Sequence, residues 1–121
     1  MAELEQKIAK NVVAALRIKK EDVVLIEANE RTAGMANRIA MEMRFRGAET
    51  ITKLSSDDVW FTSITELPLK WLRAPDKSMQ SLHNVVTAIV YIGGFGDPRK
   101  FRKISAERWE ANSVGAEETY K

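Results

Sequence analysis

The chain has 121 residues, of which 45% are hydrophobic and 30% are charged, and it contains no cysteine. This length suits one compact domain with its own core, and the lack of thiols excludes disulfides, thiolate metal sites and cysteine nucleophiles. A net charge of +2 gives no strong positive field. Because the sequence shows neither a basic, apolar leader nor a run of about 20 apolar residues, we expect a cytoplasmic protein without a membrane partner.

Apolar residues recur at helical spacing over residues 3–17, which predicts an amphipathic helix. We expect its apolar row to bury against a sheet. The row consists of Leu4, Ile8, Val12 and Leu16, with Ala9 and Val13 beside it.

Residues 23–28 then form a short apolar run between charged residues, which predicts a buried strand. Asn29 or Thr32 is suited to begin the next helix, and Gly47 stands where a left-handed residue ends it. Residues 50–54 alternate with a period of two and are more polar, which predicts an edge strand.

The second half of the chain begins with a helix-start pattern at residues 55–58, followed by two short helices that Pro68 separates. A third short helix is expected over residues 76–84. Residues 85–92 form a continuous run without charge, which is typical of a strand buried on both faces of a sheet. A glycine-rich loop follows, and a last helix begins at Ser105 and reads on to the end of the sequence.

This order of elements predicts an α/β protein. We expect a three-layer open parallel sheet of about three strands, in the order second, first, third, with helices on both faces. Residues 1–121 form a single α/β domain in this interpretation. Because the last helix leads into no further element, we expect the domain to be the N-terminal part of a longer chain.

Two loops should meet where the first and third strands end, at the switch point of the sheet. They contribute the candidate ligand-binding residues Asn29, Arg31, Thr32, Gly93, Gly94, Gly96 and Arg99. Glycine amides and arginines of this kind can cradle an anion. Alternatively, the glycines only turn the chain and allow a close approach. The second interpretation is favoured, because the spacing matches no phosphate-binding loop.

Further polar and aromatic residues have both functional and structural interpretations. Trp60 and Trp71 form either an interaction surface or a cover for the sheet, and the sequence leaves both open. The basic residues 99–103 favour a solvated helix face, so nucleic acid is not an expected partner. Asp57 and Asp58 are expected to cap a helix, and the single histidine, His83, is expected to be structural. We find no catalytic or metal-binding set and expect no cofactor in this chain.

Three stretches resemble the thermophilic metalloaminopeptidase family, which is aminopeptidase T-like and related to leucyl aminopeptidases. Residues 19–26, Lys-Lys-Glu-Asp-Val-Val-Leu-Ile, are similar to the opening of its first strand. Arg46-Gly47-Ala48 is similar to the Ala-Gly-Ala before its second strand, and residues 67–92 with the following Gly-Asp-Pro-Arg look like its third strand and exit. As an order of elements, the resemblance covers most of residues 3–115.

The resemblance implies a non-catalytic N-terminal α/β domain of a hydrolase. In that family two metal ions lie in a separate C-terminal domain, so no metal ligand is carried onto this sequence. Divalent metals would then bind only in such a catalytic domain, which this chain would scaffold or gate. The expected partners are that C-terminal peptidase domain or further copies of the chain. The alternative is a stand-alone domain that binds a small ligand or anion at the switch-point loops.

Overall fold

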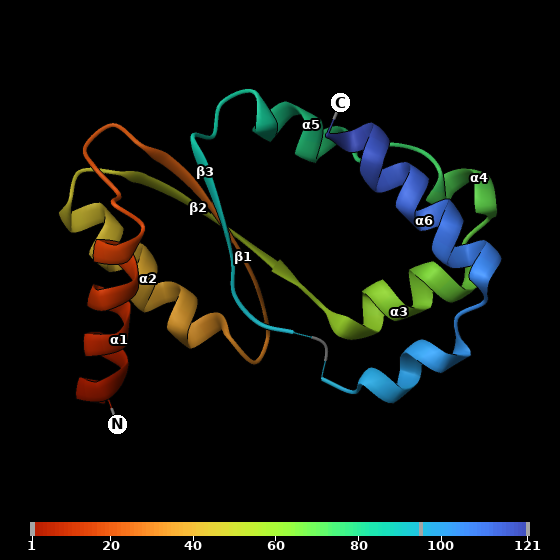
Figure 1. Ribbon diagram of the computed structural model, residues 1–121, viewed down its shortest axis with the longest axis horizontal. Helices are drawn as coiled ribbons and strands as arrows, with labels where there is room; N and C mark the ends of the chain where they lie inside the picture. Colours follow the sequence, from red (N-terminus) through yellow and green to blue (C-terminus); the bar gives the residue numbers. More distant parts are fainter. Residues whose placement is uncertain (1, 95, 121) are drawn as a thin grey trace. The chain divides into compact units, whose positions relative to one another are not determined.

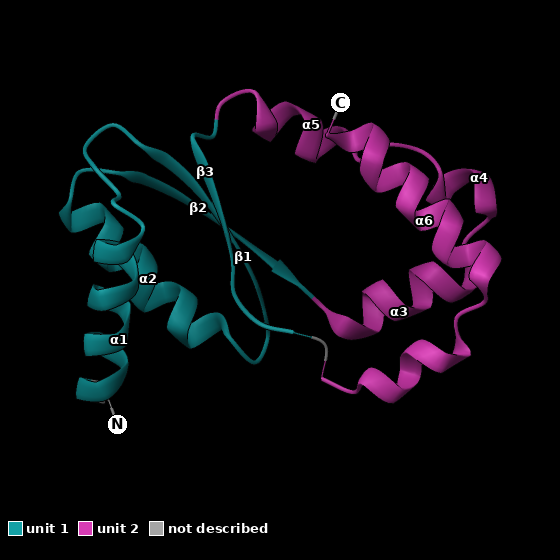
Figure 2. Ribbon diagram, in the orientation of Figure 1, with its two compact units in different colours: residues 1–55, 86–94 teal, residues 56–85, 95–121 magenta. Residues whose placement is uncertain are grey.

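The computed structural model describes residues 2–94 and 96–120, and the chain divides into two compact units (Figure 2). Unit 1 comprises residues 1–55 and 86–94, and unit 2 comprises residues 56–85 and 95–121. The elements of unit 1 are α1 (Ala2–Ala15), β1 (Val23–Asn29), α2 (Ala33–Phe45), β2 (Glu49–Ser55) and β3 (Ala88–Tyr91) (Figure 1). Those of unit 2 are α3 (Asp57–Glu66), α4 (Leu69–Leu72), α5 (Lys77–His83), the 3-10 helix η1 (Pro98–Lys103) and α6 (Ala106–Thr119).

The strands form a parallel sheet in the order β2-β1-β3, which confirms the predicted α/β class and strand order. In the register, Val24 of β1 lies beside Thr50 of β2 and Ala88 of β3. The polar strand β2 lies at an edge, as its alternating pattern predicts. Within the described residues, no helix has both the length and the apolar character needed to cross a membrane.

The third strand differs from its prediction in length and in burial. It spans Ala88–Tyr91, and it is not buried on both faces, because Ile89 and Tyr91 are 40% and 68% exposed. The central position belongs instead to β1, in which Val24, Leu25 and Ile26 are fully buried. A run of apolar residues therefore identified a strand correctly but overstated how much of it is covered.

The core of unit 1 consists of aliphatic residues from β1 and from the two helices. Helix α1 contributes Ala9 and Val13, which are fully buried, and it packs against α2. Val12 of the predicted apolar row also packs against the core, whereas Leu4, Ile8 and Leu16 of that row remain 58%, 41% and 45% exposed.

At the start of β1 and β3, Asp22 and Thr87 connect the two strands. The Asp22 carboxylate accepts hydrogen bonds from the Lys19 N–H (2.9 Å) and from the Thr87 hydroxyl (3.0 Å). The Val23 N–H in turn donates to Thr87 Oγ1 (3.0 Å). The bond from the Lys19 N–H is the main reason that the pKa of Asp22 lies below its ordinary value, and the Thr87 bond adds to it.

Unit 2 consists of short helices whose ends are fixed by side chains. Ser56, Asp76 and Ser105 each accept a hydrogen bond from a backbone N–H in the first turn of α3, α5 and α6. Pro68 precedes α4 as its N-cap, so the predicted division at this proline is confirmed to within one position. Gly115 does not end the last helix. It lies inside α6, where a Cβ would collide with the carbonyl oxygens of Leu72 and Ala74.

Candidate functional site

The loops that leave β1 and β3 meet in unit 1, because the two strands are parallel neighbours and end at the same edge of the sheet. Asn29 is the last residue of β1 and is 6% exposed. Its Oδ1 accepts hydrogen bonds from the N–H groups of Arg31 (2.9 Å) and Thr32 (3.1 Å). Its Nδ2 donates to the carbonyl oxygen of Gly94 (3.0 Å). Asn29 therefore both shapes its own turn and holds the loop after β3.

Thr32 and Arg31 make the same connection from the other side of the turn. The Thr32 hydroxyl accepts a hydrogen bond from the Asn29 N–H (3.1 Å) and donates to the Ile92 carbonyl oxygen (2.9 Å). The Arg31 guanidinium donates from Nη2 to the Gly94 carbonyl oxygen, although the residue as a whole is exposed. Three side chains of the first loop thus bind backbone carbonyls of the second.

Gly93 allows the two loops to approach this closely. Its φ of +130° lies in a region that side-chain-bearing residues rarely adopt. A Cβ at this position would lie 2.7 Å from Asn29 Nδ2 and 3.3 Å from the Thr32 side chain. This geometry supports the structural interpretation of the glycines, in which they permit contact between the loops.

Five of the seven predicted ligand-binding residues are therefore brought together, namely Asn29, Arg31, Thr32, Gly93 and Gly94. The remaining two, Gly96 and Arg99, belong to unit 2. The Gly96 N–H donates to Asp57 Oδ2 (3.0 Å). Binding of an anion or a small ligand by these residues stays a prediction.

Arg99 interacts with Asp97, two residues before it. Its N–H and its Nε both donate to Asp97 Oδ1, at 3.1 and 3.0 Å. The guanidinium bond is the main cause that lowers the pKa of Asp97, and the same bond raises the pKa of Arg99. The Arg99 side chain is 85% exposed, so this pair is a surface ion pair.

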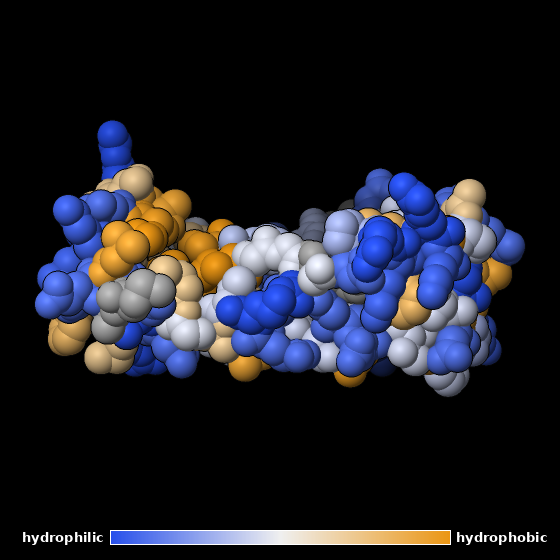
Figure 3. Space-filling view, turned by 90° about the horizontal axis from the view of Figure 1, so that it is seen from below, coloured by the Kyte–Doolittle hydropathy of each residue, from blue (hydrophilic) through white to orange (hydrophobic). Residues whose placement is uncertain are grey.

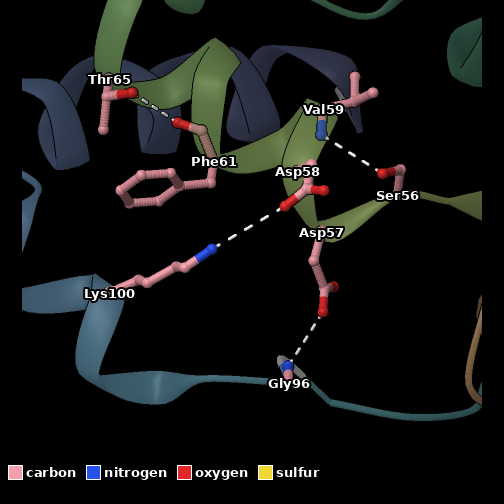
Figure 4. A network of polar contacts seen from close by, with 8 residues as sticks. All are labelled: Ser56, Asp57, Asp58, Val59, Phe61, Thr65, Gly96 and Lys100. Atoms are coloured by element: carbon pink, nitrogen blue, oxygen red, sulfur yellow. Dashed lines mark hydrogen bonds and ion pairs between the residues drawn. The ribbon is translucent and has the colours of Figure 1, made fainter.

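The start of α3 holds the segment that contains Gly96 and Lys100 (Figure 4). Lys100 Nζ lies 3.9 Å from Asp58 Oδ1 and 5.4 Å from the centre of the Phe61 ring. Asp57 and Asp58 occupy the first turn of α3, and the cap itself is Ser56, whose Oγ accepts from the Val59 N–H (3.4 Å). Both carboxylates therefore lie at a helix start, as the sequence predicts, but the residue that caps this helix is Ser56.

The two tryptophans proposed as an interaction surface differ in their surroundings. Trp60 is half-buried and packs against Phe101 and Trp109, with ring centres 5.9 and 5.8 Å away. Trp71 is 58% exposed. Trp60 therefore belongs to an aromatic cluster inside unit 2, whereas Trp71 stands at the surface, and a docking role for either residue stays a prediction.

Arg108 in α6 has a structural role that sequence patterns do not reveal. Its Nε donates to the Ile64 carbonyl oxygen, and its Nη2 donates to that of Leu67, at the end of α3. These carbonyls lie in the last helical turn, where no intrahelical N–H is available to them. An arginine in an amphipathic pattern resembles a solvated residue, so only the folded structure shows these contacts.

Over residues 2–94 and 96–120, no three His, Asp or Glu side chains lie close enough together to hold a metal ion. On the surface of unit 1, a hollow of about 240 Å³ lies at α1 and α2, away from the loops just described. It is lined by Gln6, Arg38, Met41, Glu42 and Phe45.

Neither a protein-family model nor a curated protein matches this sequence. Among solved structures, the fold is similar to that of wild-type AmpT (aminopeptidase T) from Thermus thermophilus, with a TM-score of 0.74 and 15% sequence identity. The match covers 96% of this chain and 30% of the AmpT chain. The fold of this protein is therefore found in an aminopeptidase more than three times as long as the matched region.

Proposed function

We propose that this chain is a non-catalytic α/β domain of an aminopeptidase T-like metallopeptidase. The observation that carries the proposal is the fold match, which extends over 96% of this chain but only 30% of AmpT. In this role, peptide hydrolysis and divalent-metal binding belong to a separate peptidase domain. The chain described here scaffolds that domain or gates access to its active site.

The switch-point loops support the non-catalytic part of the proposal. The side chains of Asn29 and Thr32, two of the candidate ligand-binding residues, hydrogen-bond to the turn and to the loop after β3. Such a network rigidifies the ends of β1 and β3. A rigid sheet edge suits a scaffold that holds a neighbouring domain.

The purified 121-residue chain offers a direct test of whether catalysis lies elsewhere. It would be incubated with leucyl-p-nitroanilide and with Zn²⁺, Co²⁺ or Mn²⁺ in turn, and release of the anilide would be measured. We expect no turnover above the metal-only control. Turnover that a chelator abolishes would contradict the proposal, because it would place catalytic groups in this chain.

A second candidate function is binding of a small ligand or anion, and it rests on the contact of Arg31 with the Gly94 carbonyl oxygen at the switch-point loops. Phosphate, nucleotides and small carboxylic acids at millimolar concentration should then raise the melting temperature by mass action. The rise should disappear in Arg31→Ala and persist in Arg46→Ala, which changes an exposed arginine of the same unit. No rise with any of these compounds would remove this candidate.

A further inference from the structure

In the described part of the chain, the outer edge of β2 is not paired with another strand. The sheet order β2-β1-β3 gives β2 a partner strand on one side only. Thr52 and Leu54 are exposed on this strand. The run Thr50-Ile51-Thr52 is β-branched throughout, a composition that favours strand pairing. Such an edge pairs readily with another chain unless something covers it.

The backbone groups that point to this edge follow from one hydrogen bond at the start of β2. The Glu49 N–H donates to the Asp22 carbonyl oxygen (2.8 Å), so the backbone polar groups of Glu49 point toward the β1 side. In a parallel strand, the N–H and C=O of one residue point to the same side, and those of the next residue point to the other side. Thr50, Thr52 and Leu54 therefore present their N–H and C=O groups to the outer edge.

The Arg44 side chain lies on this outer edge. Arg44 belongs to the last turn of α2, and its Nε donates to Thr50 Oγ1 (2.9 Å) while its Nη2 donates to the Thr50 carbonyl oxygen (3.1 Å). Because this carbonyl points away from β1, the guanidinium occupies space that an added strand, about 4.8 Å from β2, would need. The cation within β2 itself, Lys53, lies instead 3.8 Å from Glu27 of β1.

We propose that Arg44 covers the β2 edge and so prevents a second copy of the chain from pairing its own β2 with it. The prevented pair is antiparallel, with Thr52 opposite Thr52 and Thr50 opposite Leu54 of the second copy. This arrangement is self-complementary, because it repeats each contact about a two-fold axis.

Exposed apolar surface would add to the attraction between copies once the edge is open. In Figure 3, hydrophobic residues gather on the surface of unit 1, at the left of the view. The sheet edge belongs to the same unit, so its closure matters for keeping copies apart. The proposal concerns self-association of the chain, and it does not depend on the proposed peptidase function.

Sedimentation equilibrium of the purified 121-residue chain tests the proposal. Arg44→Ala opens the edge and should raise the association constant between copies by about tenfold or more over the wild type. Arg46→Ala is the matched control, because it removes the same charge at an exposed residue two positions further on. Its association should equal that of the wild type. Circular dichroism would confirm that both variants are folded.

Two further measurements report whether the β2 edge is the contact. Thr52→Lys, added to Arg44→Ala, places two lysines opposite each other at the centre of the pair and should return association to the wild-type level. In Arg44→Ala alone, the amides of Thr52 and Leu54 should exchange hydrogen more slowly at high than at low protein concentration. The Ile51 amide points toward β1, so its exchange should not change.

Three results would overturn the proposal. The first is an Arg44→Ala chain that associates no more strongly than Arg46→Ala at any concentration up to about 1 mM. The second is association of Arg44→Ala that Thr52→Lys leaves intact. The third is an associated Arg44→Ala chain in which the Thr52 amide exchanges as fast as in the dilute chain.

Discussion

Units 1 and 2 are of similar size but are held together in different ways. Unit 1 has an aliphatic core in which Val13, Val24, Ile26 and Met43 are fully buried. Unit 2 is built from short helices around a smaller set of buried aliphatic residues, which includes Ile64, Met79 and Ile104. Helix caps, an aromatic cluster, the Arg108 hydrogen bonds and the close approach at Gly115 add to its cohesion. Aliphatic periodicity is visible in a sequence, whereas a hydrogen bond between distant residues is not. The Arg108 contacts of unit 2 could therefore not be predicted from the sequence, whereas the buried strand β1 of unit 1 could.

The tryptophans allow this comparison to be tested. All three, Trp60, Trp71 and Trp109, belong to unit 2. Tryptophan fluorescence during urea unfolding therefore reports on unit 2, while far-ultraviolet circular dichroism reports on the helices and strands of both units. Recording both signals for each variant below shows which unit a substitution destabilises.

The largest effect is expected in the core of unit 1. Ile26→Ala removes a fully buried side chain from the central strand and should lower the free energy of unfolding by about 3 kcal/mol. The loss should be seen in the circular dichroism transition. Ile89→Ala, at a 40% exposed position of β3, should cost less than about 1 kcal/mol. Equal losses for the two variants would contradict the description of β1 as the buried centre of unit 1.

A somewhat smaller effect is expected from Gly115→Ala in unit 2. The added Cβ collides with backbone carbonyls of Leu72 and Ala74, so α4 and α6 must move apart, at a cost of about 2 kcal/mol. The fluorescence transition should report it. Gly34→Ala is the matched control, because a Cβ there meets nothing within 4 Å, and higher helix propensity should stabilise by about 0.5 kcal/mol. If Gly115→Ala also stabilised the protein, the close approach of these helices would be refuted.

Arg108→Met should lower the free energy of unfolding by about 1.5 kcal/mol, since it leaves the Ile64 and Leu67 carbonyls without this donor. Methionine preserves the apolar stem of the side chain, so the loss isolates the hydrogen bonds. Arg102→Met, at an exposed residue of η1, should change stability by less than about 0.5 kcal/mol. If Arg108→Met left the free energy of unfolding unchanged, these hydrogen bonds would contribute nothing to the stability of unit 2.

The smallest expected effect is the pH dependence of stability that Asp22 causes. Because the pKa of Asp22 is lowered in the folded protein, its ionised form is stabilising above its ordinary value of 3.8. This stabilisation is lost as the pH falls through the lower folded value. The melting temperature of Asp22→Asn should therefore lie below that of the wild type at pH 7, and the gap should close in acid. Glu30→Gln, at an exposed residue, provides the control. If the difference in melting temperature between Asp22→Asn and the wild type widened in acid, the pKa of Asp22 would be raised by folding and not lowered.

The parallel sheet and most helices follow from the sequence, because the spacing of hydrophobic residues agrees there with the positions of turn-forming and helix-capping residues. Gly47, for example, has the predicted positive φ of +89°. Helix α1 shows where such reasoning fails. Its apolar residues follow a correct helical pattern, but a pattern does not say which of them reach the core. Ala9 and Val13 are buried and Val12 packs against the core, whereas Leu4, Ile8 and Leu16 remain exposed.

The candidate site was predictable to a similar extent. Parallel strands necessarily bring the loops of Asn29 and Gly93 to one edge of the sheet, so their meeting follows from topology. Topology does not determine which groups hydrogen-bond to one another where the loops meet. Asn29 binds the turn and the Gly94 carbonyl oxygen, which only the backbone path after β3 determines.

The most direct test of the proposed function is to isolate the native protein from its source cells with an antibody raised against this chain. The isolated material would be assayed for aminopeptidase activity with and without divalent metals, and the mass of the recognised polypeptide would be measured. We expect metal-dependent activity that co-purifies with this chain while the 121-residue chain alone remains inactive. Native material that contains the chain but shows no aminopeptidase activity with any of these metals would contradict the proposal.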